Sequence, residues 1–553
     1  MDHDRSAISE LEFPLTRGEL VRRIGSPLQQ RRLRRAKAAT IFSTVLLLVG
    51  AVLGGVFGWP YLICGSGLQQ IEGECVGVND GSYSFDADLD WITERIYHMN
   101  AKVAELAETR DDVEAFRVVM MSSFSLSGEA DLSDEQITRA VEGAYVALMR
   151  QNGFADTGTG VEVVAQESRI FQLYLANEGS VQQGSQTVVT DLAAMVDDEI
   201  PLSVVIGQSS TTTVTEQVAR TLSEHRIPMI ASSSTSTTIN NVTSPGLIRS
   251  APNNEDFAAA LRDHLDRQSE LTDEPINGLL LADENESDVF SRNLADQFRR
   301  YLDPYLVQNS LTFHGSAGAG NSTVYFDHIT NEICADPTTN AVFFAGRYSD
   351  LDTFLRSLEL RGCRGAGSTP ITVYSVELGL LPKIVDGYSG TRCVSADESD
   401  DRERYRLVQA SAFDPSWLEQ GEWSPAGFHD YRAAVTGTVK AAAESTSEPE
   451  DFYSGYSLIY YDAATVAARA TLLGFEASDE DTLAASVRNH LFRVNHELTG
   501  SGQLDFLEEL AGRVTGRYIP ILSSDCTVEQ LDIDPFRTPG VPYEELYPDL
   551  PDD

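Results

Sequence analysis

The sequence predicts an α/β protein built from two doubly wound lobes, and two observations carry this prediction. Short apolar runs typical of buried parallel strands alternate with segments whose apolar residues recur at helical spacing. Two successive series of these β-α units follow one another along the chain. At 553 residues the chain is too long for one ordinary domain, and its hydrophobic content of 42% is enough for two cores.

The first series follows a Gly-rich segment at 64–82 and an expected helix at 85–110. Its apolar runs place strands at 116–125, 161–168, 171–180, 202–207 and 227–232. Helical spacing places helices between them at 133–153 and 213–226.

The second series begins after residue 268. We expect its strands at 276–287, 341–347 and 371–379, with helices at 289–303 and 348–363. Three later segments return to complete the lobes, namely 406–413, a helix at 456–474, and 517–522. The final stretch at 532–553 is Pro-rich and acidic, a composition typical of poorly ordered chain.

Ala38–Phe57 is the one long apolar segment of the chain. About 20 residues make roughly 30 Å of helix, which matches the thickness of a bilayer core. All charged residues between 22 and 37 are basic, so the positive-inside rule keeps the N-terminus cytoplasmic and places the rest of the chain outside the cell membrane. A cleaved signal peptide is the competing interpretation, but the exit sequence GWPYLICG lacks a small-x-small cleavage pattern. A lipoprotein is disfavoured because Leu62 and Ile63 precede Cys64.

The net charge of −43 disfavours nucleic acid as a partner, since binding it requires a basic face. Six cysteines all lie at or beyond the outer end of the apolar segment, which suits disulfides in an oxidising compartment. Their order suggests three pairs and leaves other connectivities open. These pairs are Cys64 with Cys75, Cys334 with Cys363, and Cys393 with Cys526. None has the CxxC spacing typical of zinc sites, and we expect no metal and no cofactor.

Two strand ends of the first series lead directly into small hydroxyl residues. Ligands of open α/β sheets bind beyond the carboxyl ends of the strands, and a helix that starts there favours an anionic group. These hydroxyl residues therefore predict a ligand cradle, and the alternative is that they only cap helices or form a Ser/Thr-rich loop. They are Ser209 and Ser210 in the first loop and Ser232, Ser233 and Ser234 in the second.

Five motifs occur in the order VVIGQSS, IPMIASSSTSTT, LIRSAPNNEDFAAAL, FFAGRYSDLDTFLRSL and YSLIYYDAATVAARA. This order resembles the type I periplasmic binding proteins of the branched-chain amino acid transporter class, over roughly residues 113–525. The anchor and the Gly-rich collar resemble a membrane-tethered variant as found in actinobacteria. The resemblance implies two Rossmann-like lobes joined by a three-segment hinge, with crossings near 252–255, 402–408 and 500–506.

With this fold the chain divides into six parts. They are a cytoplasmic basic segment (1–37), a transmembrane helix (38–61), a collar with a lead-in helix (62–112), lobe 1 (113–254 and 405–505), lobe 2 (255–404 and 506–525) and an acidic Pro-rich tail (526–553).

The resemblance also implies roles for residues of both lobes. The serines of the cradle would hold the acidic end of a ligand, and Glu377 would hold an ammonium group. Asn254 stands where the family usually has an Asp, a departure that leaves the ligand's identity open. Phe290 and Tyr348 would form aromatic walls, and Arg347 could bind a further acidic group.

Each of these second-lobe roles has a simpler alternative. Glu377 could be a solvated loop acid, Phe290 the first core residue of its helix, and Arg347 part of a surface ion pair.

Catalysis has no support in the sequence. The triplet Asp156-Thr157-Gly158 matches an aspartic protease motif but occurs once and reads as a polar turn before a strand. His490 and His496 are spaced for neither a helical metal pair nor an HExxH site. We therefore expect no enzyme.

The expected function is a membrane-anchored substrate-binding protein that captures a small polar solute outside the cell by lobe closure. Its partners would be the small-molecule ligand and an ABC permease and ATPase. Two alternatives stay open: a ligand-sensing receptor domain that signals to a membrane partner, and a surface protein that has lost its ligand.

Overall fold

The computed structural model describes residues 64–126, 132–207, 211–272, 275–315, 323–363, 371–389, 392–393, 405–419, 423–442, 452–529 and 536–538. The chain divides into one unit from Met1 to Ser66 and a compact unit from Gly67 to Asp553, and both lobes belong to the second unit. The expected membrane helix at 38–61 lies outside the described residues. Within the described ranges, no helix combines the length and the apolarity of a membrane span.

The first lobe is built on a seven-stranded sheet with the order β1-β2-β6-β3-β7-β8-β9. The strands from β6 to β9 are parallel, whereas β1 and β2 run antiparallel at one edge. The strands are β1 (Gln69–Ile71), β2 (Glu74–Asn79), β3 (Glu114–Ser122), β6 (Arg169–Asn177), β7 (Leu202–Gly207), β8 (Met229–Ala231) and β9 (Leu247–Arg249).

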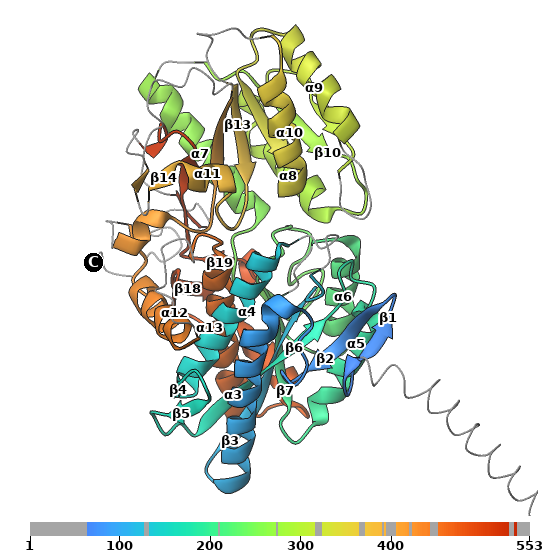
Figure 1. Cartoon of the computed structure of the whole chain (residues 1–553), viewed down its shortest axis with the longest axis vertical. Helices are drawn as coiled ribbons and strands as arrows, with labels where there is room; N and C mark the ends of the chain where they lie inside the picture. The colour runs from blue at the N-terminus through green and yellow to red at the C-terminus, as the bar shows by residue number, and fades with distance from the viewer. Residues whose placement is uncertain are drawn as a thin grey trace, which may run out of the picture. The chain divides into compact units, whose positions relative to one another are not determined.

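Helices cover both faces of this sheet (Figure 1). Because alternate strand residues point to opposite faces, Val119 and Val205 pack with α5 and α6, while Val118 and Val204 pack in the core shared with α3, α4 and α13. A capping box between Ser133 and Gln136 starts α4. The helices are α3 (Asp90–Thr109), α4 (Asp134–Gln151), α5 (Ser185–Ala194), α6 (Thr213–Glu224), α12 (Phe428–Ala442), α13 (Tyr456–Ala477) and α14 (Leu483–His490).

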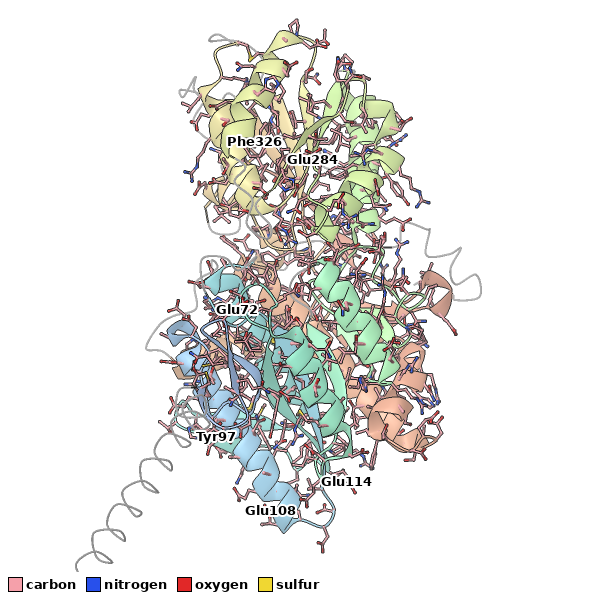
Figure 2. All side chains as sticks on the ribbon, turned by 90° about the vertical axis from the view of Figure 1, so that its right-hand side faces the viewer. Glu72, Tyr97, Glu108, Glu114, Glu284 and Phe326 are labelled. Carbon is pink, nitrogen blue, oxygen red and sulfur yellow. A yellow bond between two sulfur atoms is a disulfide. The ribbon has the colours of Figure 1, made fainter. Side chains whose placement is uncertain are left out.

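The segment expected as a collar belongs to this lobe. β1 and β2 extend its sheet through the pairing of β2 with β6, and α3 packs against β6. Figure 2 shows Glu108 and Glu114 where the chain turns from α3 into β3. The triplet Asp156-Thr157-Gly158 lies at the turn between β4 (Phe154–Asp156) and β5 (Val161–Val163), an antiparallel pair outside the main sheet.

The second lobe contains a six-stranded sheet with the order β11-β10-β12-β13-β16-β21. All neighbours are parallel except β16 and β21, which are antiparallel. The strands are β10 (Gly278–Asp283), β11 (Leu311–Phe313), β12 (Ala341–Ala345), β13 (Ile371–Val376), β16 (Tyr405–Ala410) and β21 (Ile521–Ser523).

This sheet is also covered on both faces. Leu281 and Phe344 pack in a core that includes Phe326 of α9, a residue labelled in Figure 2, whereas Leu280 and Phe343 pack on the face of α8. The helices are α7 (Asn254–Thr272), α8 (Val289–Tyr301), α9 (Thr323–Ala335), α10 (Tyr348–Leu360) and α11 (Pro382–Asp386). The two sheets with helices on both faces agree with the expected doubly wound α/β class.

The expected boundary at residue 405 is wrong by one strand. β16 pairs with β13 along its whole length, so residues 405–410 belong to the second lobe. The second crossing therefore follows Ala410 and precedes α12. The first crossing joins β9 to α7, and the third runs from β18 (Gly502–Phe506) through β19 (Val514–Thr515) to β21.

The expected tail at 526–553 contains a strand. β22 (Phe536–Arg537) pairs antiparallel with β20 (Tyr518–Ile519), so this part of the tail is held against the third crossing. Residues 539–553 lie outside the described ranges.

The structure contains the disulfide between Cys334 and Cys363, which ties the end of α9 to the segment that follows α10. Cys64, Cys75 and Cys526 are also disulfide-bonded. The side chain of Cys393 lies outside the described part of the chain.

Candidate functional site

The carboxyl ends of the two parallel sheets meet at hydrogen-bonded loops. The N–H of Phe290 donates to the carbonyl of Thr211 at 3.1 Å, and the N–H of Thr213 donates to the carbonyl of Ser287 at 3.3 Å. One loop follows β7 of the first lobe, and the other follows β10 of the second. Since ligands of open α/β sheets bind beyond this end of the strands, we take this meeting of loops as the candidate functional site.

The predicted hydroxyl loop after β8 is buried here. Ser232 donates to its own strand at the carbonyl of Ile230, over 3.3 Å, and Ser234 accepts from Thr211 at 3.2 Å. Ser233 lies 3.1 Å from the hydroxyl of Tyr460 in α13. The buried hydroxyl of Thr235 has no hydrogen-bond partner among the described residues. Of these hydroxyl groups, only that of Ser232 is bonded to the loop's own strand, and the others remain directed to groups elsewhere or lack a described partner.

Glu178 places a carboxyl group close enough to act on the hydroxyl of Tyr460, which contacts this loop. It follows the last residue of β6 and is 1% exposed. Ser185 donates to its Oε2 at 2.8 Å, whereas its Oε1 has no partner within the described residues. Burial raises the pKa of Glu178 to about 7. The carboxyl is thus half satisfied in hydrogen bonding.

Two tyrosines of α13 connect the lobes. Tyr456 and Tyr460 are four residues apart and share one face of the helix. Tyr460 contacts Ser233 of the first lobe, and the hydroxyl of Tyr456 donates to Oε1 of Glu377 in the second lobe at 3.2 Å. Burial raises the pKa of Tyr460 to about 12, so its hydroxyl stays protonated at neutral pH.

A glycine starts α13 at this contact. Gly455 has φ of +69°, a left-handed conformation that glycine tolerates best. A Cβ on Gly455 would lie 2.9 Å from the carbonyl of Leu378. The first turn of α13 therefore approaches the backbone after β13 closely.

Glu377 is placed at the site by the end of β13. Its Oε1 accepts from its neighbour's N–H, that of Leu378, at 2.9 Å and from Tyr456. Burial raises the pKa of Glu377. These contacts make Glu377 a partly enclosed group and do not fit a freely solvated loop acid.

Arg347 forms an ion pair with Asp288. Its Nε lies 2.7 Å from Oδ2 and its Nη2 lies 3.0 Å from Oδ1 of that carboxylate. The Asp288 side chain is 0% exposed. Arg347 therefore forms an ion pair, as the simpler alternative expected, but the pair is buried and does not lie on the surface. The guanidinium carbon also lies 5.7 Å from the ring centre of Phe290. A second acidic partner would have to compete with Asp288.

Asn254 takes part in the contact between the lobes. Its Nδ2 donates to the carbonyl of Phe290 at 3.2 Å and to Oδ1 of Asn293 at 3.1 Å. Asn293 in turn accepts from the N–H of Thr237 at 3.0 Å and donates to its hydroxyl at 2.7 Å. This network joins α8 of the second lobe to the hydroxyl loop of the first.

Among the remaining predicted residues, the one that the structure describes, Tyr348, is not brought together with this group. Ser209 and Ser210 lie outside the described residues. Tyr348 starts α10 and is 39% exposed. The pKa of Tyr348 is raised, and burial is the largest cause. The charges that act on its hydroxyl come from Asp352, Arg356 and Asp386, none of which belongs to the site.

The sequence reasoning missed Glu178, Tyr456 and Tyr460. Glu178 follows an apolar run, as the predicted serines do, so the same rule about strand ends could have found it. The tyrosines are spaced four apart in the first two turns of an expected helix. No signal in the sequence indicates which face of that helix meets the site.

Over the described ranges, no group of three or more His, Cys, Asp or Glu residues could hold a metal ion.

Comparison with protein-family models and with curated proteins finds no match. Among solved structures, the chain is similar to an ABC transporter substrate-binding protein from Desulfitobacterium hafniense in complex with Leu. The TM-score is 0.49 at 15% identity, with 74% of this chain and 97% of that chain covered.

Two further solved structures are similar to a comparable degree. The branched-chain amino acid transporter substrate-binding protein LivJ from Streptococcus pneumoniae, in complex with isoleucine, has a TM-score of 0.48 at 16% identity, with 74% of this chain and 95% of that chain covered. A solute-binding protein of an ABC transporter from Rhodopseudomonas palustris, in complex with 3,4-dihydroxybenzoic acid, has a TM-score of 0.49 at 13% identity, with coverage of 74% and 93%. At these values the similarity carries no inference about the ligand, and the fold assignment rests on the two sheets themselves.

Proposed function

We propose that this protein is a membrane-anchored extracellular substrate-binding protein of an ABC-type transporter, which holds a small polar solute between its lobes. The observation that carries the proposal is the composition of the site: Glu178 and Ser233 come from the first lobe, Glu377 comes from the second, and the α13 tyrosines touch both. A ligand that contacts groups of both lobes stabilises their closed arrangement by its preference for that state.

The side chains at the site favour an amino acid or a related compound as the solute. Two carboxyls with raised pKa values, the buried Glu178 and the partly enclosed Glu377, suit a ligand that brings an ammonium group or several N–H donors. The hydroxyls of Ser233 and Thr235 suit its carboxylate. Arg347 is already engaged by Asp288, which disfavours a ligand with a second strongly acidic group.

The location of the protein is part of the proposal. Ala38–Phe57 would form the anchor, with the basic residues before it in the cytoplasm. The lobes would then face the outside of the cell, where the disulfide of Cys334 and Cys363 is stable.

The test starts from the full-length chain purified in detergent. Small molecules released by denaturation are identified by mass spectrometry, and amino acids, amides and organic acids are screened for a rise in melting temperature. We expect an amino acid or a related amine to be released or to stabilise the protein. If organic acids without an amine stabilise it and amines do not, the proposed ligand class is wrong.

Calorimetry with the ligand so found tests the site itself. Tyr460→Phe removes one hydroxyl and should weaken binding about fivefold or more, the effect of losing one hydrogen bond. Tyr145→Phe is the matched control, because Tyr145 is equally buried but its hydroxyl contacts Asp156 in the β4–β5 hairpin. If Tyr460→Phe and Tyr145→Phe bound the ligand equally well, α13 would not contribute to the ligand-binding site.

A further inference from the structure

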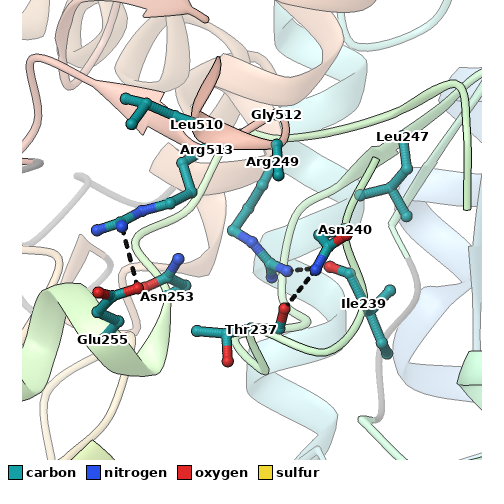
Figure 3. A pocket seen from close by; sticks show the side chains of 11 residues that line it. Thr237, Ile239, Asn240, Leu247, Arg249, Asn253, Glu255, Leu510, Gly512 and Arg513 are labelled. Carbon is teal, nitrogen blue, oxygen red and sulfur yellow. Dashed lines mark hydrogen bonds and ion pairs between the residues drawn. The ribbon is translucent and has the colours of Figure 1, made fainter. Parts of the chain in front are cut away.

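A cavity of about 250 Å³ lies beside the first and third crossings (Figure 3). Its walls come from the loop after β8, from residues 249–255 and from residues 510–513. None of the lining residues is Glu178, Ser233, Glu377, Tyr456 or Tyr460. The cavity is therefore lined by a different set of side chains from the candidate functional site.

Arg249 is the unusual residue of this cavity. It is 3% exposed, and its Nη2 donates to the carbonyls of Ser236, at 2.8 Å, and Ile239. Its Nη1 has no hydrogen-bond partner among the described residues, and no carboxylate there lies within ion-pair distance of it. Figure 3 shows its guanidinium in the middle of the lining residues, between Asn253 and Asn240. A buried cation with an unused donor group is costly unless an anion completes it.

The acidic groups near the cavity are bound by other arginines. Arg513 contacts Glu255 at 3.0 Å and also pairs with Asp256, and Arg300 contacts Glu255 at 3.5 Å. Burial lowers the pKa of Arg249 to about 10, so Arg249 stays charged at neutral pH. Among the residues that line the cavity, two are arginines, Arg249 and Arg513, and one is a carboxylate, Glu255, which is a local positive excess in a chain of net charge −43.

We propose that this cavity is a second binding site, which takes a small oxyanion such as inorganic phosphate. The planar guanidinium of Arg249 presents Nη1 to one oxygen, and Arg513 supplies a second positive group from the opposite crossing. A bound oxyanion would link residues 249–255 to residues 510–513. It would thus hold together two of the three connections between the lobes, whatever ligand the lobes themselves carry.

The test titrates the full-length chain with sodium phosphate by calorimetry at neutral pH, against sodium chloride at matched ionic strength. We expect saturable binding of phosphate with one site per chain. Arg249→Met keeps the unbranched first part of the side chain but removes the guanidinium, and should weaken this binding about tenfold or more, because a charge-assisted contact is lost. Arg361→Met is the matched control, since Arg361 is similarly buried, at 5% exposed, and donates to a carbonyl, that of Leu358, away from the cavity.

A second variant acts in the opposite direction. Glu255→Gln removes the carboxylate that lines the cavity and leaves Arg513 paired with Asp256 alone, so phosphate should bind about threefold or more tightly. This result would stand even if Arg249→Met failed to fold. Phosphate that binds no better than chloride overturns the proposal, and so does binding that neither substitution changes.

Discussion

Glu178 combines full burial with a carboxyl oxygen that lacks a partner in the described part of the chain. Its pKa of about 7 in the folded protein lies above its ordinary value of 4.5. The fold therefore favours the protonated carboxyl. The stability contributed by this group is complete below about pH 4.5 and is lost as the pH rises through about 7.

We expect Glu178→Gln to remove the decrease in the free energy of unfolding that the parent protein shows as the pH rises. At pH 8 the variant should be more stable than the parent protein by up to about 3 kcal/mol, and at pH 4 the two should be nearly equal. Urea unfolding at both pH values measures the difference. The control is Glu224→Gln, at the exposed end of α6, which should show no pH-dependent gain. A stability difference for Glu178→Gln that does not change with pH would contradict the assigned pKa shift.

The same residue shows what sequence reasoning can and cannot reach at a site. The rule about strand ends finds Ser233 and Glu377, since it needs only the end of an apolar run. The burial of Glu178, by contrast, is set by the folded surroundings, in which it lies close enough to Tyr460 of α13 to act on its hydroxyl, although the two residues are distant in sequence. Asn254 was expected near a ligand because of its position in a motif, and its amide bonds Asn293 of α8.

At the scale of elements, one ion pair ties α13 to the hinge. Arg517 and Asp462 are both 0% exposed, with Nη1 and Oδ2 3.2 Å apart. Arg517 also donates to the carbonyl of Ser250 in the first crossing. The third crossing, the first crossing and α13 are therefore joined by a single guanidinium.

Arg517→Met should lower the free energy of unfolding by about 3–5 kcal/mol, because it leaves the Asp462 carboxylate buried without its counter-ion. Replacing both residues, as in R517M/D462L, should cost less than the single change, since no unpaired charge remains. Denaturant unfolding of the two variants makes the comparison. A double variant that is less stable than R517M would show that the pair itself, and not the stranded charge, provides the stability.

Prediction of elements succeeded where burial is continuous along the chain. β7 matches the expected strand at 202–207 because every residue of it is buried, so the apolar run and the strand coincide. β1 and β11 are only three residues long, with exposed or half-buried positions, and leave no such pattern. β16 was expected as a segment but assigned to the wrong lobe, because its partner β13 is set by pairing, which periodicity does not encode.

For the whole molecule, the side chain of Asn293 is one of the groups that join the lobes. It bonds Thr237 of the first lobe twice and Asn254 at the first crossing once. The balance between open and closed lobes should depend on these bonds, since each is worth about 1 kcal/mol.

Asn293→Ala should shift the ligand-free protein toward more open lobes. The radius of gyration from small-angle scattering should rise, and the affinity for the ligand should fall about threefold to tenfold in proportion to the lost closed population. Asn489→Ala serves as the control, because Asn489 bonds Glu480 on the exposed surface of one lobe. An unchanged radius together with an unchanged Kd would show that Asn293 does not govern closure.

The pairing of β22 with β20 has a practical consequence. The carbonyl of Thr538 accepts from the N–H of Gly516, and its hydroxyl accepts from the N–H of Arg517. A recombinant protein shortened before residue 536 would expose these amides beside the arginine that joins the crossings. Affinity tags, protease sites and fluorescent labels therefore belong after residue 538, where they leave the pairing of β22 with β20 intact.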